Sequence, residues 1–221
     1  MTRLYVVGAA GHGREVASVL RDVEQAGSTP GEVVGFLDED PKLHGRRLNG
    51  LPVLGGLDLL SKEAGKAGLV LGVGYPEVKF QLVQRLKNMN VSWPAIVHPS
   101  ATLGAGLELA RGVFLQAGTI LAVNIRVGDF VTVNIGATVS HDCSLGPFST
   151  LSPGANLGGN VEVGEGAFLG IGATTVQNVV IGAWSVIGAG AVVLDDVPPN
   201  AVVAGIPARV IRTRPEGWQH G

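Results

Sequence analysis

Aliphatic residues recur at every sixth position along the second half of the chain. From Val97 to Val193 each sixth residue is Leu, Ile or Val, with one exception at Thr175. A helix cannot keep such residues on one face, because it turns once every 3.6 residues. A short strand followed by a corner suits the spacing, since six is a multiple of the two-residue alternation of a strand. Three such sides close a triangular coil, and stacked coils bury a continuous aliphatic column.

Small residues accompany this period. The position after an aliphatic anchor is often glycine, as at Gly128, Gly146 and Gly164, and we expect these residues at corners, where glycine reaches backbone angles that strain other residues. Two positions before an anchor stands a small or β-branched residue, such as Ala137 or Ala155, which we expect to point inward. The pattern predicts a parallel β-helix over residues 93–205, and residues 206–221 form a C-terminal tail.

The first part of the chain has a different pattern. Residues 3–7 predict a buried strand, which runs into the glycine-rich segment 8–13 and a helix from Arg14 to about Glu24. Further strands are predicted at 32–37 and 69–73. Alternating strands and helices indicate a small Rossmann-like parallel α/β sheet, which we assign to residues 1–92. The glycine spacing is G-x-x-G-x-G rather than the dinucleotide G-x-G-x-x-G, so an NAD site is disfavoured.

Composition narrows the possible partners. The net charge is −2, which gives no electrostatic basis for binding nucleic acid or an anionic membrane. Residues 166–194 lack charge, yet their polar residues and their period of six argue against a membrane span. The start of the chain lacks the pattern of a signal peptide. The single cysteine, Cys143, excludes an internal disulfide, and we expect a cytoplasmic protein with Cys143 in the core.

Only one of the five histidines lies within the body of the repeat. His141 follows its anchor Val139 by two places, so its side chain is expected to project from a corner, and Asp142 comes next. Imidazole suits general-base chemistry near neutral pH, and a carboxylate can hold the ring in one tautomer. Gly159 lies one coil beyond His141 and has no side chain to block an approaching carbonyl. The alternatives for His141 are an exposed corner residue or a contact between subunits.

The whole chain resembles a known family. Its [aliphatic]-Gly-x-x-[small]-x repeat resembles that of the hexapeptide-repeat acyltransferases, which implies a left-handed parallel β-helix, closed by the tail at 206–221, and a homotrimer with active sites between neighbouring helices. The order of the parts is similar to that of sugar acetyltransferases related to bacillosamine and perosamine N-acetyltransferases, and to sialic-acid O-acetyltransferase-like proteins. The segments that carry the resemblance are VVGAAGHGREV, VVGFLDED, GVGYPEVK, NIGATVSHDCSLGPFS and VVAGIPARVIR.

The resemblance implies a nucleotide-sugar site in the first domain. There the first loop approaches phosphate and the acidic cluster after the second strand contacts the base. The alternatives are a solvated loop for the acidic cluster and a surface turn for the histidine. The implied substrate-binding residues are Gly11, His12, Gly13, Asp38, Glu39 and Lys79, the last on the helix after the third strand.

The resemblance also implies an acyl-transfer site. His141 is the base, and Asn134 stands seven residues before it, as in the family's N-x-x-x-x-x-x-H-[DE] motif. The Gly159 amide meets the oxyanion. Asp142 stands where some relatives have the longer Glu, and Thr150 where some have a second histidine. Asn134 alternatively occupies a left-handed corner. Acetyl-CoA is expected along Ile171, Ala189 and Arg209, for which a structural or solubilising role is the alternative.

The sequence therefore predicts an acetyl-CoA-dependent N-acetyltransferase that acts on the amino group of a UDP- or GDP-linked 4-amino sugar. An O-acetyltransferase acting on a sugar or sialic acid would use the same residues. A β-helix scaffold or a carbonic anhydrase is the alternative outside the transferases. Zinc in such an anhydrase needs about three histidine ligands and the repeat offers one, so no metal is expected.

Overall fold

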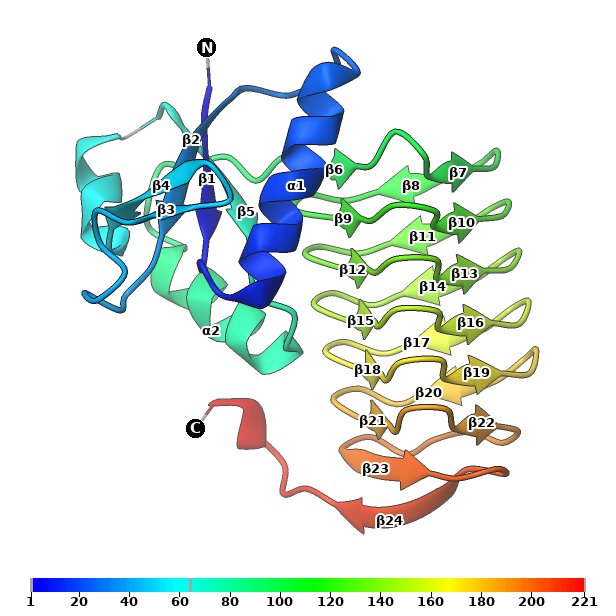
Figure 1. Ribbon diagram of the computed structural model, residues 1–221. Helices are drawn as coiled ribbons and strands as arrows, with labels where there is room; N and C mark the ends of the chain where they lie inside the picture. The colour runs from blue at the N-terminus through cyan, green and yellow to red at the C-terminus, as the bar shows by residue number, and fades with distance from the viewer. Residues whose placement is uncertain (1, 64, 221) are drawn as a thin grey trace.

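The computed structural model describes residues 2–63 and 65–220. An α/β domain stands beside one side of a column of stacked coils, and a C-terminal tail returns from the end of the column toward the α/β domain (Figure 1). The predicted combination of a small parallel sheet with a left-handed parallel β-helix is confirmed. Residues 166–194, uncharged and apolar, form coils of that column, and none of the described helices is long and apolar enough to cross a membrane.

The α/β domain has one five-stranded sheet in the order β3-β4-β2-β1-β5. Its core lies between the sheet and α1, where Val6, Leu20 and Phe36 are fully buried. Strands β1, β2, β4 and β5 run parallel to one another, whereas β3 pairs antiparallel with β4. The elements are β1 (Arg3–Val7), α1 (Gly11–Gln25), β2 (Glu32–Leu37), β3 (Arg47–Leu48), β4 (Leu51–Gly55), η1 (Leu57–Lys62), β5 (Ala67–Leu71) and α2 (Pro76–Leu86).

The predicted strands at 3–7 and 32–37 are confirmed, while two other boundaries differ. The third strand lies two residues earlier than predicted, and helix α1 begins at Gly11 rather than at Arg14. The first turn of this helix packs tightly on the sheet, since a Cβ at Gly13 would collide with the carbonyl oxygen of Gly8. The glycine-rich segment is therefore a short loop followed by a helix N-terminus. The β3–β4 hairpin was not predicted.

The β-helix has three faces made of two-residue strands. Each strand pairs in parallel with the strand one coil away, eighteen residues along the chain, as Thr132 does with Thr150. Face 1 comprises β6 (Ile96–Val97), β9 (Phe114–Leu115), β12 (Thr132–Val133), β15 (Thr150–Leu151), β18 (Phe168–Leu169), β21 (Val186–Ile187) and β23 (Ala201–Ala204). Face 2 comprises β7 (Thr102–Leu103), β10 (Ile120–Leu121), β13 (Thr138–Val139), β16 (Asn156–Leu157), β19 (Thr174–Thr175) and β22 (Val192–Val193). Face 3 comprises β8 (Glu108–Leu109), β11 (Arg126–Val127), β14 (Ser144–Leu145), β17 (Glu162–Val163) and β20 (Val180–Ile181).

The sixth-position anchors point inward, as predicted. Each is the second residue of its strand, and most are almost fully buried, Thr175 included; Leu103 in the first coil is 39% exposed. The small residues two positions earlier, such as Ala137 and Ala155, are fully buried with them. Cys143 also lies in this core, as expected, and burial raises the pKa of its thiol. One hydrophobic column therefore runs through all the coils.

The glycines that follow the anchors have a different role from the one predicted. They do not supply left-handed backbone angles; those occur two positions later, for example at Gly136 and Gly154. A Cβ on Gly164 would instead lie 2.5 Å from the backbone nitrogen of Ala183 in the next coil. Glycine is needed at this position because successive coils approach too closely for a side chain.

We name the corners of the coil by the faces they join. Corner 3–1 packs against the α/β domain through aromatic residues in left-handed conformation, including Phe130 and Phe148. Phe80 of α2 makes edge-to-face contacts with Phe148 at 5.5 Å and with Trp184 at 5.6 Å between ring centroids. Burying such large rings contributes strongly to association between the two domains.

The tail adds strand β24 (Arg209–Thr213), antiparallel to β23, and the short helix η2 (Trp218–His220). The ring of Trp218 lies 6.4 Å from that of Trp184, and the backbone oxygen of Gln219 accepts a hydrogen bond from Gln81 of α2. The tail therefore contacts both the last coils and the α/β domain.

Candidate active site

His141 projects from corner 2–3, as its place in the repeat predicted. Its side chain is 62% exposed, and its Nδ1 lies 2.8 Å from Oδ2 of Asp142. A neutral imidazole that donates from Nδ1 carries its free lone pair on Nε2, which is the arrangement a general base needs. The shorter Asp142 thus reaches the ring despite the absence of the longer Glu.

Asp142 adopts a left-handed conformation, with φ of 60°, at the start of a tight turn. Its second oxygen, Oδ1, accepts a hydrogen bond of 3.0 Å from Nδ2 of Asn124 in the preceding coil. The hydrogen bond from Asn124, followed by that from His141, lowers the pKa of Asp142. The carboxylate is therefore ionised and held from both sides.

Gly159 lies directly beneath the His141 ring. A Cβ at this position would lie 2.5 Å from both Cε1 and Nε2 of the imidazole, so the ring occupies the space that a side chain would fill. Among the described residues, none accepts a hydrogen bond from the Gly159 N–H. A donor without a protein partner beside the base is what oxyanion stabilisation requires.

A cavity of about 500 Å³ lies between α1, the segment after β5 and the C-terminal coils of face 1. Its size is in the range of small-molecule sites. Tyr75 stacks on Phe168 with 5.9 Å between ring centroids and forms part of the apolar wall. The cavity brings together His12, Asn134, Ile171 and Ala189, all of which the sequence had singled out, and also Glu15, Gly74, Thr150, Ser152, Pro153, Gly170, Val186, Ile187 and Gly188.

His12 contributes a largely buried imidazole to this cavity. Its Nδ1 lies 3.1 Å from Oε2 of Glu15, one helical turn further along α1. Burial lowers the pKa of His12, although Glu15 opposes this effect. Its Nε2 is buried and has no hydrogen-bond partner in the described part of the chain. His12 is therefore a helix residue that faces the cavity rather than a residue of an exposed turn.

Asp38 and Glu39 are engaged in the fold around the glycine-rich loop. Asp38 Oδ2 accepts a hydrogen bond of 2.7 Å from the backbone N–H of Ala9, which ties the end of β2 to the start of that loop. Glu39 forms an ion pair with Arg85 and accepts a hydrogen bond from Leu57. The interpretation of Asp38 as part of a merely solvated loop is therefore wrong.

Lys79 lies apart from the expected substrate site. Its ammonium group is completely buried between α2 and corner 3–1. It donates hydrogen bonds to Phe130 O at 2.9 Å, Ser149 O at 3.1 Å and Thr132 Oγ1 at 3.2 Å. Because burial disfavours the charged form, the pKa of Lys79 lies well below its usual value. Lys79 holds the two domains together, and we leave it out of the substrate site.

Thr150 has a similar bridging contact. Its hydroxyl donates a hydrogen bond of 2.9 Å to Gly74 O, at the edge of the cavity. The residue that replaces a second histidine therefore fixes the loop that carries Tyr75.

Asn134 and His141 stand on different corners of the same chain. Asn134, Ile171 and Ala189 belong to corner 1–2, which borders the cavity. His141 and Gly159 belong to corner 2–3, on the side of the column away from the α/β domain (Figure 1). Asn134 does not have positive φ, so the left-handed-corner interpretation is wrong for it; its Oδ1 lies 3.5 Å from Nε2 of Gln116.

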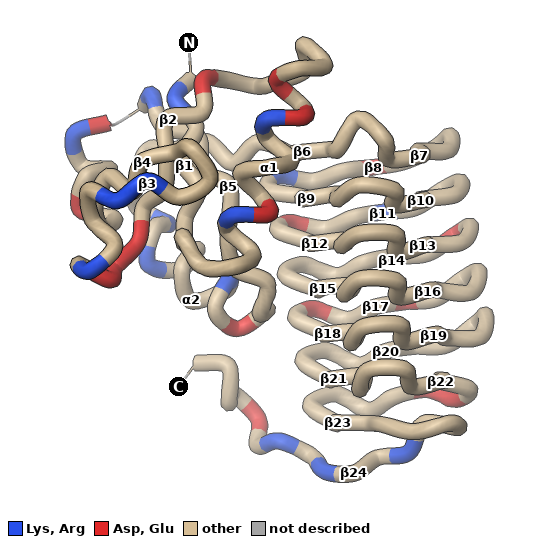
Figure 2. The backbone as a smooth tube through the Cα atoms, viewed as in Figure 1, with Lys and Arg blue, Asp and Glu red and all other residues tan. Residues whose placement is uncertain are grey.

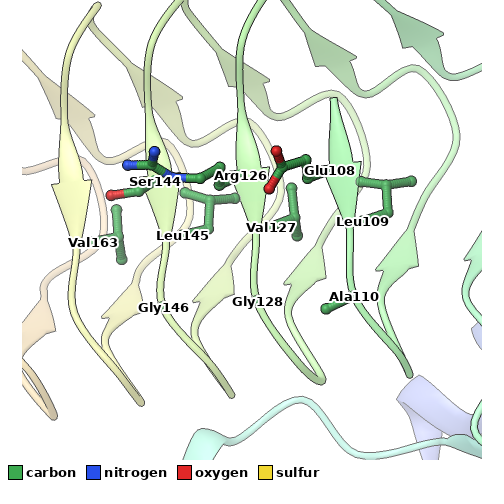
Figure 3. A pocket seen from close by; sticks show the side chains of 10 residues that line it. All are labelled: Glu108, Leu109, Ala110, Arg126, Val127, Gly128, Ser144, Leu145, Gly146 and Val163. Atoms are coloured by element: carbon green, nitrogen blue, oxygen red, sulfur yellow. The ribbon is translucent and has the colours of Figure 1, made fainter. Parts of the chain in front are cut away.

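Arg209 and the outer surface of face 3 lie outside the cavity. Arg209 is exposed on β24, 3.9 Å from Asp195. A second hollow, of about 460 Å³, lies along face 3, where Glu108 and Arg126 on neighbouring strands stand beside aliphatic and small residues (Figure 3). Its lining contains no imidazole, thiol or aromatic ring. The described residues contain no group of three His, Cys, Asp or Glu side chains placed to hold a metal ion.

Comparison with solved structures covers nearly the whole chain. GDP-perosamine N-acetyltransferase from Caulobacter crescentus is 32% identical, with a TM-score of 0.86 over 96% of this chain and 98% of that one. WeeI from Acinetobacter baumannii is 33% identical, with a TM-score of 0.85 over 96% of this chain and 100% of that one. The chain belongs to the hexapeptide-repeat sugar acetyltransferases. The predictions of this family and of an acyltransferase are thereby confirmed.

Two further comparisons bear on the same family. The acetyltransferase domain of PglB from Neisseria gonorrhoeae is 31% identical, with a TM-score of 0.85 over 96% of this chain and 100% of that one. Residues 3–86 match the family described as the PglD N-terminal domain. A comparison with curated proteins finds no match.

Sequence reasoning missed three residues of this acyltransferase that the structure brings to the candidate site. Asn124 stands eighteen residues before Asp142, and Glu15 stands one helical turn after His12, so both spacings were available in the sequence. Tyr75 had no comparable signal, because its contact with Phe168 depends on how the two domains pack.

Proposed function

We propose that the protein transfers the acetyl group of acetyl-CoA to the amino group of a nucleotide-linked amino sugar. The observation that carries this proposal is the cavity shared by the two domains. It places the glycine-rich loop and helix N-terminus of the α/β domain beside the corner expected to hold the acyl donor. The structurally similar GDP-perosamine N-acetyltransferase is described in complex with CoA and GDP-perosamine, which supports both ligand classes.

The acceptor's phosphates fit the N-terminal end of α1. Gly11, His12 and Gly13 form its first turn, where backbone N–H groups without helical partners favour an anion. Asp38 and Glu39 follow β2 at the same edge of the sheet, although their structural contacts leave only part of each carboxylate for a nucleotide.

The donor fits the C-terminal coils. Ile171 and Ala189 offer an apolar wall for the pantetheine arm, and Ile171 is 63% exposed. From residue 127 to residue 208 the chain has no Lys or Arg. The basic side chains beside the last coils therefore belong to the tail (Figure 2). Arg209 and Arg212 are exposed there, and we assign Arg209 to the CoA phosphates.

His141 acts as the base in this proposal. Its Nε2 takes the proton released as the acceptor nitrogen bonds to the acyl carbon, while Asp142 stabilises the imidazolium that forms. The Gly159 N–H donates to the oxyanion of the tetrahedral intermediate. When the carbon–sulfur bond breaks, His141 returns the proton to the thiolate of CoA.

In this proposal one active site combines corner 1–2 of one chain with corner 2–3 of a second chain, because the two corners of a single chain lie on opposite edges of face 2. Both corner 1–2 and corner 2–3 border face 2, so turning face 2 toward a shared three-fold axis brings His141 of the partner subunit next to the cavity. The outward residues of face 2 support this arrangement, because all of them are uncharged: Thr102, Ile120, Thr138, Asn156, Thr174 and Val192. Exposed apolar residues flank it on both corners, among them Val123 at 42% and Ile135 at 48%.

Product analysis tests the proposed reaction. The protein is incubated with acetyl-CoA and UDP- or GDP-linked 4-amino sugars, and released thiol and acetylated product are measured. We expect an acetamide on the sugar, with turnover lowered at least tenfold in His141→Ala. An ester product, or acetylation only of sugars that lack an amine, would show an O-acetyltransferase. If His141→Ala retained the turnover of the wild type, His141 would not be the base.

Mixed oligomers test the two-chain site. His141→Ala spoils corner 2–3, whereas Ala189→Trp obstructs corner 1–2, so each variant alone is expected to be inactive. If the two are unfolded and refolded together, about one quarter of the sites in random trimers combine two intact corners. Recovery of about that fraction of wild-type activity supports the arrangement. No recovery in oligomers shown by mass spectrometry to be mixed would place the whole site within one chain.

A further inference from the structure

Corner 2–3 carries a ladder of short polar side chains in left-handed conformation. Asn124, Asp142, Asn160 and Asn178 occupy equivalent places in four successive coils, with φ between 56° and 60°. Asparagine and aspartate tolerate this backbone better than other non-glycine residues. The corner alone explains why these four positions hold Asn or Asp.

Two pairs of residues in the ladder are joined by side-chain hydrogen bonds. Asn160 Nδ2 donates to Asn178 Oδ1 at 2.9 Å, which is an ordinary contact between neutral amides. Asn124 Nδ2 donates to Asp142 Oδ1 at 3.0 Å, so in this case the acceptor is a carboxylate. The other oxygen of that carboxylate lies 2.8 Å from His141 Nδ1. Asn124, Asp142 and His141 therefore form a continuous chain of hydrogen bonds that the rest of the ladder lacks.

The geometry restricts Asp142 to one orientation. A carboxylate on a single-methylene side chain can rotate about χ1 and χ2, and only some of these orientations keep Oδ2 against the imidazole. The hydrogen bond from the preceding coil selects such an orientation, because the backbone of Asn124 is fixed by its own N–H bond to Ala105 O at 2.9 Å. A side chain that is 52% exposed would otherwise exchange this contact for water.

We infer that Asn124 is a positioning residue for acetyl transfer, which acts by holding Asp142 against His141. This inference rests on the proposed function of His141. Asn124 lies one coil from His141, and the hydrogen bonds of the described residues link the two only through Asp142. The hydrogen bond also lowers the pKa of Asp142, which keeps the carboxylate charged where it faces the ring.

Asn124→Gly removes the amide and keeps a residue suited to the left-handed backbone. The expected result is a fall of about fivefold in kcat, with KM for both substrates unchanged, because one charge-assisted hydrogen bond is lost and no substrate contact changes. Asn178→Gly is the matched control, since it removes the other ladder hydrogen bond at the same type of corner, and we expect it to leave kcat unchanged. Equal losses in the two variants would make the effect structural and overturn the inference.

A double variant separates positioning through Asp142 from a direct role. In the Asp142→Ala background, Asn124→Gly is expected to add no further loss of kcat. A further fivefold loss there would show that Asn124 acts by another route.

The tautomer of His141 is read independently of turnover. Nitrogen-15 chemical shifts of the imidazole are expected to show Nδ1–H predominating in the wild type and a mixture of tautomers in Asn124→Gly. If the wild type transfers no acetyl group but the tautomer still changes, the proposed function fails and the positioning contact stands. If the wild type is active and neither kcat nor tautomer changes in Asn124→Gly, the positioning role of Asn124 fails alone.

Discussion

A methyl group at residue 159 tests the arrangement of the catalytic corner most directly. In the structure the added Cβ would lie 2.5 Å from Cε1 and from Nε2 of His141. Non-bonded carbon atoms settle at about 3.5 Å or more, so the ring must move by about 1 Å. Gly159 does not have left-handed φ, so alanine fits its backbone and the imidazole is what has to give.

A displacement of this size is expected to matter for catalysis and little for stability. Misplacing a catalytic group by about 1 Å costs on the order of 100-fold in rate, and Gly159→Ala should lower kcat by about this factor. The exposed ring has room to swing away, so the free energy of unfolding should change by less than about 0.5 kcal/mol. Steady-state kinetics and thermal unfolding of the same preparations measure both quantities.

The control combines this change with His141→Ala. Without the imidazole the new methyl group has nothing to displace, so the double variant should match His141→Ala in turnover. Wild-type kcat in Gly159→Ala would refute the reasoning, because it would mean that the ring beside Gly159 is not in its working position. A large loss of stability would instead mean that the coil depends on glycine here for its fold.

Three other changes test different parts of the structure. Lys79→Met should abolish one pH dependence of the free energy of unfolding. Because burial lowers the pKa of Lys79, the unfolded wild type binds one more proton than the folded protein between that lowered pKa and about 10.5. The free energy of unfolding of the wild type therefore rises with pH across this window. Urea titrations at several pH values compare the two proteins, and equal slopes would mean that burial does not lower the pKa of Lys79. Leu151→Ala opens a cavity in the fully buried column and should cost about 2–5 kcal/mol in a urea titration, whereas a loss below about 1 kcal/mol would argue against tight packing there. Ala189→Trp should raise the Kd for acetyl-CoA at least tenfold in calorimetry while leaving the melting temperature nearly unchanged, and unaltered binding would exclude this corner as the donor site.

Periodicity was enough to predict the column, because burial imposes a rule that repeats at every coil. Each anchor must be apolar to face the shared core, and the residue two positions before it must be small or β-branched to share that core. His141 could be singled out in the same way, since a polar residue outside the inward positions must project from a corner. The adjacent Asp142 needed no tertiary information to be placed beside it.

Proximity across the coil was predicted less well. Asn134 and His141 are seven residues apart, which in a triangular coil is about one side, so the chain turns a corner between them. Residues eighteen apart stack directly, and this is why Asn124 reaches Asp142 and Gly159 lies beneath His141. The repeat contained this information, which was used to place Gly159 beside His141 but was not applied to Asn124.

The sequence by itself determined which residues face the core and which corner each exposed residue occupies, because both follow from a period that every coil obeys. Only the tertiary structure decided how the α/β domain sits against the column. Phe130 and Phe148 of corner 3–1 recur with the coil period, but Lys79 and Phe80 of α2 occur once, so the α/β side of the contact leaves no period to detect. The same packing created the cavity, turned His12 and Tyr75 toward it, and removed Lys79 from it.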